Sequence, residues 1–126
     1  MIVIPQHNKD KTLNDINDFI PFLTKRINII EWKISVEWCT GENAELIMES
    51  QESPIALSHS QFCELYNGIY QTVDGFFEIV ANEGKLQISA IDSSFWEISS
   101  NIPELENDFK FEYGEYINPF PNNELA

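Results

Sequence analysis

The chain has 126 residues, of which 7 are Lys or Arg and 21 are Asp or Glu, so its formal net charge at pH 7 is -14. A field of this sign repels phosphate, which argues against direct binding to nucleic acid or to an anionic membrane surface. A content of 43% hydrophobic and 13% aromatic residues excludes a disordered acidic chain and predicts one folded domain over residues 1–126.

The negative charge is concentrated after the first thirty residues. Residues 1–30 contain four Lys or Arg and three Asp, which leaves +1, whereas residues 31–126 contain three Lys and eighteen carboxylates, which leaves -15. A field of this size attracts positive surfaces. The distribution therefore predicts a basic partner that contacts the later part of the chain.

Two interpretations are open for the first residues. Residues 1–11 begin apolar and then turn polar, which predicts either a short edge strand or an N-terminal arm. Thr12 and Asp15 have the spacing of a helix capping box, and apolar residues follow at helical intervals as far as Ile27. Pro21 lies inside this pattern, so we expect the helix to kink or to split there.

A strand is predicted over residues 30–39, where apolar and polar side chains alternate. Its apolar positions are Ile30, Trp32, Ile34, Val36 and Trp38. Turn-forming residues 40–43 follow this strand. Residues 44–50 are then predicted to return as an antiparallel partner, with Leu46 and Met48 in the core.

A second helix is predicted from Ser58 to Asp74. Ser58 and Gln61 have capping-box spacing, and Gly75 follows Asp74 as helix C-termini favour. The buried side of this helix would contain Phe62, Leu65, Tyr66, Ile69 and Val73.

Three further strands are predicted at residues 76–81, 85–91 and 95–99, because two short segments rich in turn-forming residues separate them. A last helix begins at Asn101, which has capping-box spacing with Glu104, and ends near Gly114. Residues 117–126 are expected to form a loose tail. The order of elements predicts an α+β domain with about five mostly antiparallel strands and three helices packed on the sheet.

No group of residues in the sequence indicates catalysis. His7 lies in the predicted arm, and His59 lies at a helix N-terminus, where a protonated imidazole is disfavoured. Cys39 and Cys63 lack metal-ligand spacing, and the glycines are scattered. We therefore predict a non-enzymatic protein without a metal or cofactor.

The N-terminus carries no basic segment followed by a long apolar run, and no apolar stretch is long enough to span a bilayer. These features predict a cytoplasmic protein with reduced thiols.

Carboxylates and large apolar residues share one parity of the predicted strands, which is typical of an interaction face. The members of this face are Glu31, Glu37, Glu45, Ile47, Glu49, Phe76, Glu78, Phe95 and Glu97. A second acidic surface is predicted on the last helix, at Glu104, Asp108 and Glu112. One alternative is that helices cover both faces of the sheet and these residues belong to the core, since register cannot be read from sequence. The alternative for the last helix is that its acidic side is merely solvated.

The stretch from Leu57 through Ile98, in a short acidic chain rich in Trp, Phe and Tyr, resembles the small immunity proteins that bacteria pair with secreted or contact-delivered toxins. The resemblance implies an α+β protein of contact-dependent growth inhibition, or of a similar system, that neutralises a cognate basic toxin. Nuclease toxins carry basic clefts for phosphate, which a carboxylate-rich surface can occupy.

Two other functions remain open from the sequence. The acidity is also expected of a nucleic-acid mimic that blocks a DNA-binding protein, although mimicry needs carboxylates spaced like phosphates. An enzyme or small-ligand carrier would instead use a pocket between sheet and helices, lined by Trp32, Trp38 and Trp96.

Overall fold

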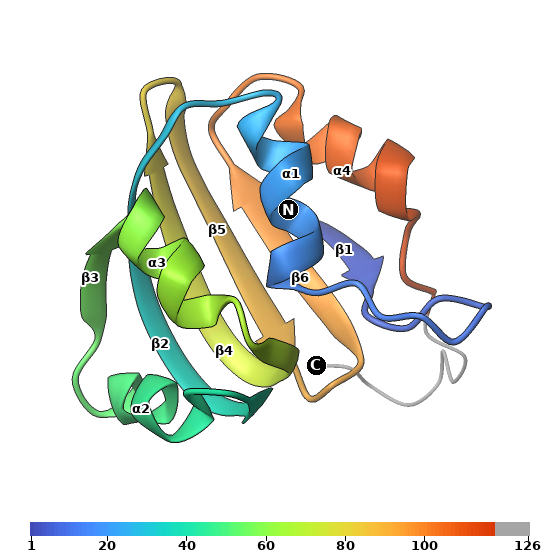
Figure 1. Cartoon of the computed structure of the whole chain (residues 1–126). Helices are drawn as coiled ribbons and strands as arrows, with labels where there is room; N and C mark the ends of the chain where they lie inside the picture. Colours follow the sequence, from blue (N-terminus) through green and yellow to red (C-terminus); the bar gives the residue numbers. More distant parts are fainter. Residues whose placement is uncertain (118–126) are drawn as a thin grey trace.

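The computed structural model describes residues 1–117, which form an α+β fold with a six-stranded antiparallel sheet and four α-helices (Figure 1). The strands are β1 (Ile2–Pro5), β2 (Ile29–Gly41), β3 (Ile55–Ser58), β4 (Ile69–Ala81), β5 (Gly84–Ile91) and β6 (Phe95–Ser100). The helices are α1 (Ile16–Thr24), α2 (Ala44–Met48), α3 (His59–Tyr66) and α4 (Leu105–Tyr113), with a 3-10 turn, η1 (Glu49–Gln51), after α2. The predicted class is confirmed, with one more strand and one more helix than the sequence indicated.

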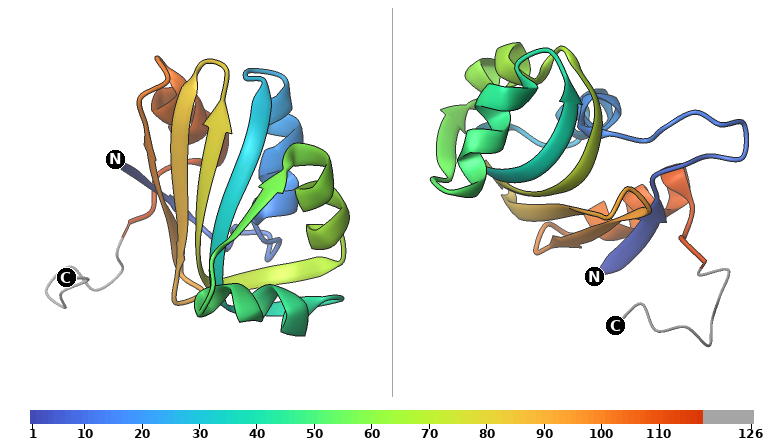
Figure 2. Two further views of the ribbon diagram at one scale, coloured as in Figure 1. Left: turned by 90° about the vertical axis from the view of Figure 1, so that its left-hand side faces the viewer. Right: turned by 90° about the horizontal axis from the view of Figure 1, so that it is seen from below.

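The strands lie in the order β1-β6-β5-β4-β2-β3, and each neighbouring pair is antiparallel. Helices α1 and α3 lie on the same face of the sheet, and α2 lies at one end of it (Figures 1 and 2). Helix α4 packs beside α1, since the rings of Phe19 and Phe109 meet at 5.5 Å between centroids.

Aromatic rings form the centre of the core. Phe62 of α3 stacks on Trp32 of β2 with 3.8 Å between ring centroids, and Phe19 of α1 meets Trp96 of β6 edge-on at 5.2 Å. Phe77 of β4 lies between the two tryptophans. The two halves of the sheet therefore share one continuous core.

Strand β2 alternates as predicted in its middle but not at its ends. Trp32, Ile34 and Val36 are buried, whereas Ile30 is 53% exposed and Trp38 is 56% exposed. The pairing with β4 shifts register on both sides of this segment. Because a bulge inserts an unpaired residue, it reverses the alternation, and this reversal turns Trp38 outward.

The predicted hairpin partner over residues 44–50 is wrong, because these residues form α2 and the start of η1. The burial is also the reverse of the prediction, since Leu46 is 51% exposed and Ile47 is fully buried. Ala, Glu, Leu and Met have high helix propensity, and they occupy all but one of positions 44–49. The strands that pair with β2 are β3 and β4.

A close backbone approach redirects the chain at the end of β2. Gly41 has φ +130, and a Cβ built there would lie 2.2 Å from the carbonyl oxygen of Gly68. The amide of Glu42 then donates to that same oxygen at 2.9 Å. Only glycine can adopt this positive φ and also approach the Gly68 carbonyl so closely. The chain therefore leaves β2 at Gly41 and enters α2 instead of returning in a hairpin.

Ser50 ties this helical segment to the sheet, and its removal is expected to destabilise the fold. The fully buried Oγ donates to the carbonyl of Ile47 at 2.6 Å and accepts from the amide of Val36 at 2.8 Å. Ser50→Ala leaves the Val36 amide without its acceptor, so the free energy of unfolding should fall by about 1–3 kcal/mol in urea titrations. The exposed Ser53 provides the control, since Ser53→Ala should change it by no more than about 0.5 kcal/mol. Equal effects of the two variants would contradict the assignment.

Helix α3 starts as predicted and ends earlier. The Ser58 and Gln61 capping box is present in both directions, but the helix ends at Tyr66, and Ile69 and Val73 lie in β4. Tyr, Thr and Val in this segment favour a strand once a partner is available, and β2 supplies that partner.

The two other helices begin later than predicted. The N-cap of α1 is Asp15, in a capping box with Asp18, while the Thr12 hydroxyl donates to Asp10. Pro21 lies within α1 without ending it. Helix α4 ends at Tyr113, with Gly114 as its C-cap, so the predicted end near Gly114 is confirmed. It begins only at Leu105, because the Asn101 side chain instead accepts from the amide of Lys85.

The remaining strand predictions agree with the structure. Residues 1–11 include β1, so the edge strand is the correct one of the two interpretations. The meander over β4, β5 and β6 is confirmed, with β4 beginning seven residues before the predicted strand. Residues 118–126 of the predicted tail lie outside the described part of the chain.

Candidate protein-binding surface

The outer face of the sheet, opposite α1 and α3, carries mixed charge. The register places Glu31, Lys33 and Glu78 on it, and Lys85 and Glu97 lie at the same parity of β5 and β6. Lys33 pairs with Glu78 at 3.9 Å. With three carboxylates and two ammonium groups, this face lacks the strong negative field that its glutamates alone suggested.

Two apolar members of the predicted face are not available to a partner. Ile47 is fully buried in the core, because the segment that carries it is a helix rather than a strand. Phe95 is 7% exposed, and the ring of Tyr116 covers it at 4.9 Å between centroids. Phe76 remains 39% exposed on the outer face. The alternative that these apolar residues belong to the core is therefore correct for Ile47.

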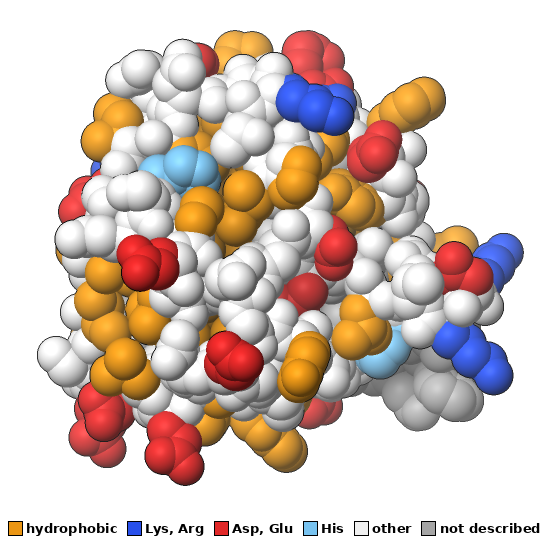
Figure 3. Space-filling model, viewed as in Figure 1, with side chains coloured by type: hydrophobic (Ala, Val, Ile, Leu, Met, Phe, Trp, Pro, Cys, Tyr) orange, Lys and Arg blue, Asp and Glu red, His pale blue; other side chains and the backbone are white. Residues whose placement is uncertain are grey.

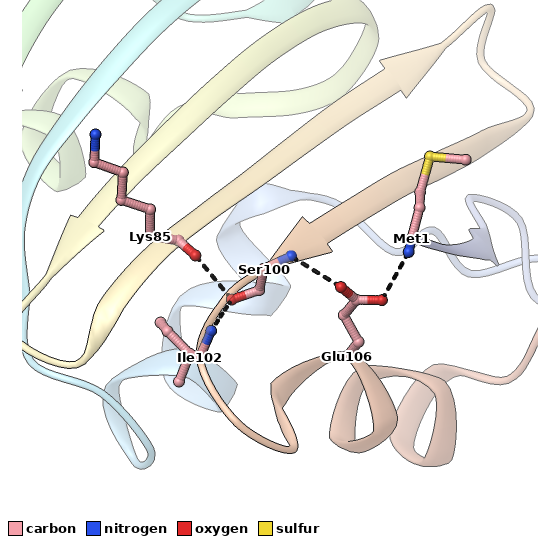
Figure 4. A network of polar contacts seen from close by, with 5 residues as sticks. All are labelled: Met1, Lys85, Ser100, Ile102 and Glu106. Atoms are coloured by element: carbon pink, nitrogen blue, oxygen red, sulfur yellow. Dashed lines mark hydrogen bonds and ion pairs between the residues drawn. The ribbon is translucent and has the colours of Figure 1, made fainter.

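The carboxylates of the last helix are partly engaged within the molecule. Asp108 lies 3.5 Å from the Arg26 guanidinium, and Glu104 precedes α4 as its N-cap residue, without a capping hydrogen bond. Glu106 accepts from the amide of Ser100 and pairs with the amino group of Met1, each at 3.0 Å (Figure 4). The hydrogen bond from Ser100 is the main cause that lowers the pKa of Glu106. Among the residues predicted on this surface, Glu104 and Glu112 are exposed.

The structure gathers uncompensated acidity at another place, around α2, η1 and α3. The five exposed glutamates there, which we call the acidic end, are Glu42, Glu45, Glu49, Glu52 and Glu64. Three of them, at positions 45, 49 and 52, line one hollow. None of the five takes part in the ion pairs found among residues 1–117.

Sequence reasoning identified Glu45 and Glu49 but missed the other three members of the acidic end. A signal was present, since residues 34–84 contain no Lys or Arg at all. Glu37, also predicted, is exposed on β2 within this cation-free range. The structure thus moves Glu45 and Glu49 from the predicted flat sheet face to a hollow that they share with Glu52.

An apolar groove of about 460 Å³ lies between α2, β3 and α3. Its lining, which we call the edge groove, consists of Asn43, Leu46, Ile55, Leu57, Gln61, Glu64 and Leu65. Figure 3 shows hydrophobic side chains gathered at the lower left, over α2 and β3, with Asp and Glu side chains around them. The groove therefore combines an apolar floor with a negative rim.

The groove borders an open edge of the sheet. Strand β3 pairs with β2 on one side, and no other strand within residues 1–117 pairs with its outer side. The opposite edge differs, because the carbonyl of Val3 in β1 accepts from the amide of Tyr116 at 2.9 Å. An unpaired edge strand presents backbone donors and acceptors that another chain can use.

The histidine on α3 is held in its neutral form. The indole Nε1 of Trp32 donates to Nδ1 of His59 at 2.9 Å, and burial lowers the pKa of His59. The Cys63 thiol lies 3.7 Å from Nε2 of the same ring, and burial raises its pKa. A neutral thiol beside a neutral imidazole is not an activated nucleophile.

The tryptophans do not line a common pocket. Trp32 and Trp96 are fully buried in the core, whereas Trp38 is exposed on the surface. Within residues 1–117, no three His, Cys, Asp or Glu side chains lie close enough together to hold a metal ion. None of the helices in this part of the chain is long and apolar enough to cross a membrane.

One carboxyl group is buried beneath the surface. Asp15 accepts hydrogen bonds from the amide and the hydroxyl of Thr72 and from the amide of Ile16, each at 2.8 Å. The Tyr66 hydroxyl bonds to the same Thr72 hydroxyl. Burial raises the pKa of Asp15 to about 6. This network joins α1, α3 and β4, so its role is structural.

No family model matches the chain, and no curated protein and no solved structure matches it. Its function is therefore inferred from its own surface, in which the acidic end, the edge groove and the open edge of β3 lie together.

Proposed function

We propose that this chain is a non-enzymatic inhibitor of the immunity-protein type, which acts in the cytoplasm by binding and neutralising a basic protein toxin. The observation that supports this function is the acidic end beside the edge groove: five exposed glutamates around a concave apolar surface. Uncompensated charge of one sign beside apolar anchors is suited to a protein partner of opposite sign.

Charge and groove contribute to binding in different ways, the first to the association rate and the second to the dissociation rate. The net charge of -14 accelerates the approach of a basic partner, because complementary fields steer diffusional encounter. The edge groove slows dissociation, since a buried apolar anchor gives up its contacts only when the complex opens. A nuclease toxin is a suitable partner, because its phosphate-binding cleft is basic and is blocked when glutamates occupy it.

A bacterial growth assay tests this function. The protein encoded beside this chain's gene is expressed in a host, where we expect it to arrest growth, and coexpression of this chain should restore growth. Glu42→Lys combined with Glu45→Lys should weaken the purified complex by at least about tenfold, because it places positive charge at the acidic end. The measurement is the dissociation constant at about 50 mM and about 500 mM salt, and affinity should fall as salt rises.

The matched control is Glu104→Lys combined with Glu112→Lys, which makes the same change of charge beside and on α4. We expect this control to retain tight binding and to restore growth. If coexpression of the unmodified chain does not restore growth, the immunity function is wrong. If both double variants weaken the complex equally, bulk charge rather than the acidic end recruits the partner.

A further inference from the structure

The edge groove has the geometry of a strand-addition site. Within β3, Ile55 and Leu57 pair with Ile34 and Trp32 of β2, which are buried on the helix-covered face, so the side chains of Ile55 and Leu57 point to that face. They are nevertheless only half-buried, because β3 is the last strand on this side. One more strand beside β3 would cover them and complete the row.

An added strand would have to alternate apolar and polar side chains. Successive side chains of a strand point to opposite faces, so every second residue would enter the edge groove. Leu46 of α2 and Leu65 of α3 form the far wall of the groove, and Leu46 is 51% exposed. A volume of about 460 Å³ lies within the range of pockets that bind ligands.

The charge at this place selects the remaining side chains of the added strand. Glu64 lies in the groove lining, and the rest of the acidic end is on the neighbouring α2 and η1. Lys and Arg at the ends or on the polar face of the strand would find these carboxylates, and Asp or Glu would be repelled.

The same charge disfavours a second copy of this chain as the occupant. Pairing two β3 edges with each other would bring two acidic ends together, each with five glutamates and no Lys or Arg between residues 34 and 84. Like charges placed opposite one another destabilise a complex. The groove therefore suits a different, basic chain.

We infer that the edge groove binds an extended segment of a basic protein partner, which pairs with the outer edge of β3, inserts alternate apolar side chains between α2 and α3, and sets Lys or Arg against the acidic end. This inference rests on the proposed function, because it specifies how the toxin would be held. It also names β3, rather than the outer sheet face, as the centre of the interface.

A synthetic peptide of alternating Lys and Leu, labelled for fluorescence anisotropy, tests the inference with the full chain. It should bind at least about tenfold more tightly than a peptide of the same composition with its leucines in one block. Binding should also slow hydrogen exchange of backbone amides within Ile55–Ser58, because pairing protects them.

Leu46→Asp should weaken binding of the alternating peptide by at least about tenfold, since it puts a carboxylate into the apolar wall of the groove. Phe111→Asp, at a 91% exposed position of α4, is the control and should bind as the unmodified chain does. The exposure of both positions allows both variants to fold, which their circular dichroism spectra can verify.

Equal affinity for the two peptides, or unchanged exchange within β3, would overturn strand addition. These results are separate from the growth assay. If the chain restores growth but exchange within β3 is unchanged in the toxin complex, the immunity function stands and the strand-addition mode is wrong. If β3 is protected by the alternating peptide but growth is not restored, the groove binds basic segments and the immunity function is wrong.

Discussion

Replacement of Phe77 by Ala is expected to lower the free energy of unfolding by about 3–5 kcal/mol, the largest effect of any single change considered for this chain. Phe77 is fully buried at the centre of β4. Its ring meets the rings of four core residues, namely Trp32, Phe62, Tyr66 and Trp96. Truncation removes these contacts and leaves a cavity, because close-packed rings from two strands and a helix cannot all move inward.

Urea unfolding followed by tryptophan fluorescence measures this effect. Phe111→Ala is the control, since Phe111 is 91% exposed and its removal should change stability by no more than about 0.5 kcal/mol. Phe77→Leu retains most of the volume and should lose about 1–2 kcal/mol, which provides a folded variant if the alanine variant does not fold. A loss below about 1 kcal/mol for Phe77→Ala would show that Phe77 is not central to the core.

The second large effect is a dependence of stability on pH that arises from Asp15. Its carboxyl has an ordinary pKa of 3.8 in the unfolded chain, and burial raises the pKa to about 6 in the fold. The folded state therefore holds the proton more tightly. The stabilisation is fully present below pH 3.8 and is lost as the pH rises through about 6, a change of about 3 kcal/mol.

The contribution of Asp15 is isolated by measuring unfolding free energies from pH about 4 to about 7 for two proteins, the unmodified chain and Asp15→Asn. The difference between the two proteins should change by about 2–2.5 kcal/mol over this range, which is most of the full change, because the amide of the variant does not titrate. Other carboxylates cancel in the difference. Parallel pH profiles would contradict a raised pKa for Asp15.

One further measurement, independent of stability, can test the assignment to Asp15. Carbon-13 NMR of the unmodified protein should show its carboxyl titrating with a midpoint of about 6. Asp10 provides the contrast, because the hydroxyl and amide of Thr12 hydrogen-bond to it and lower its pKa. The two aspartates should therefore titrate on opposite sides of the ordinary value of 3.8.

The location of the acidity has a direct consequence for the proposed partner. On the outer sheet face, Lys33 and Lys85 offset the glutamates, whereas the acidic end has no Lys or Arg in its part of the sequence. The proposed basic partner should therefore approach the β3 side of the molecule. Substitutions at Glu31 or Glu97 are expected to affect binding less than substitutions at Glu42 or Glu45.

The sequence by itself determined the features that depend on neighbouring residues. The alternation from Trp32 to Val36, the capping box at Ser58 and Gln61, the end of the last helix at Gly114 and the meander of the last three strands all follow from local patterns. The excess of carboxylates beyond residue 31 also predicted an acidic surface. The structural signals each lie within a few residues and the charge is a simple sum along the chain, so no distant contact is needed to read them.

Only the tertiary structure decided where the acidic surface lies and which apolar residues accompany it. Residues 44–50 are short enough to fit a strand or a helix, and the close approach of Gly41 to Gly68 selects the helix. Residues 69–75 fit either a continued helix or a strand, and pairing with β2 selects the strand. Both decisions come from contacts between distant parts of the chain, whose energy exceeds the small local preference. Those contacts buried Ile47, exposed Leu46 and placed Glu45 and Glu49 beside the edge groove.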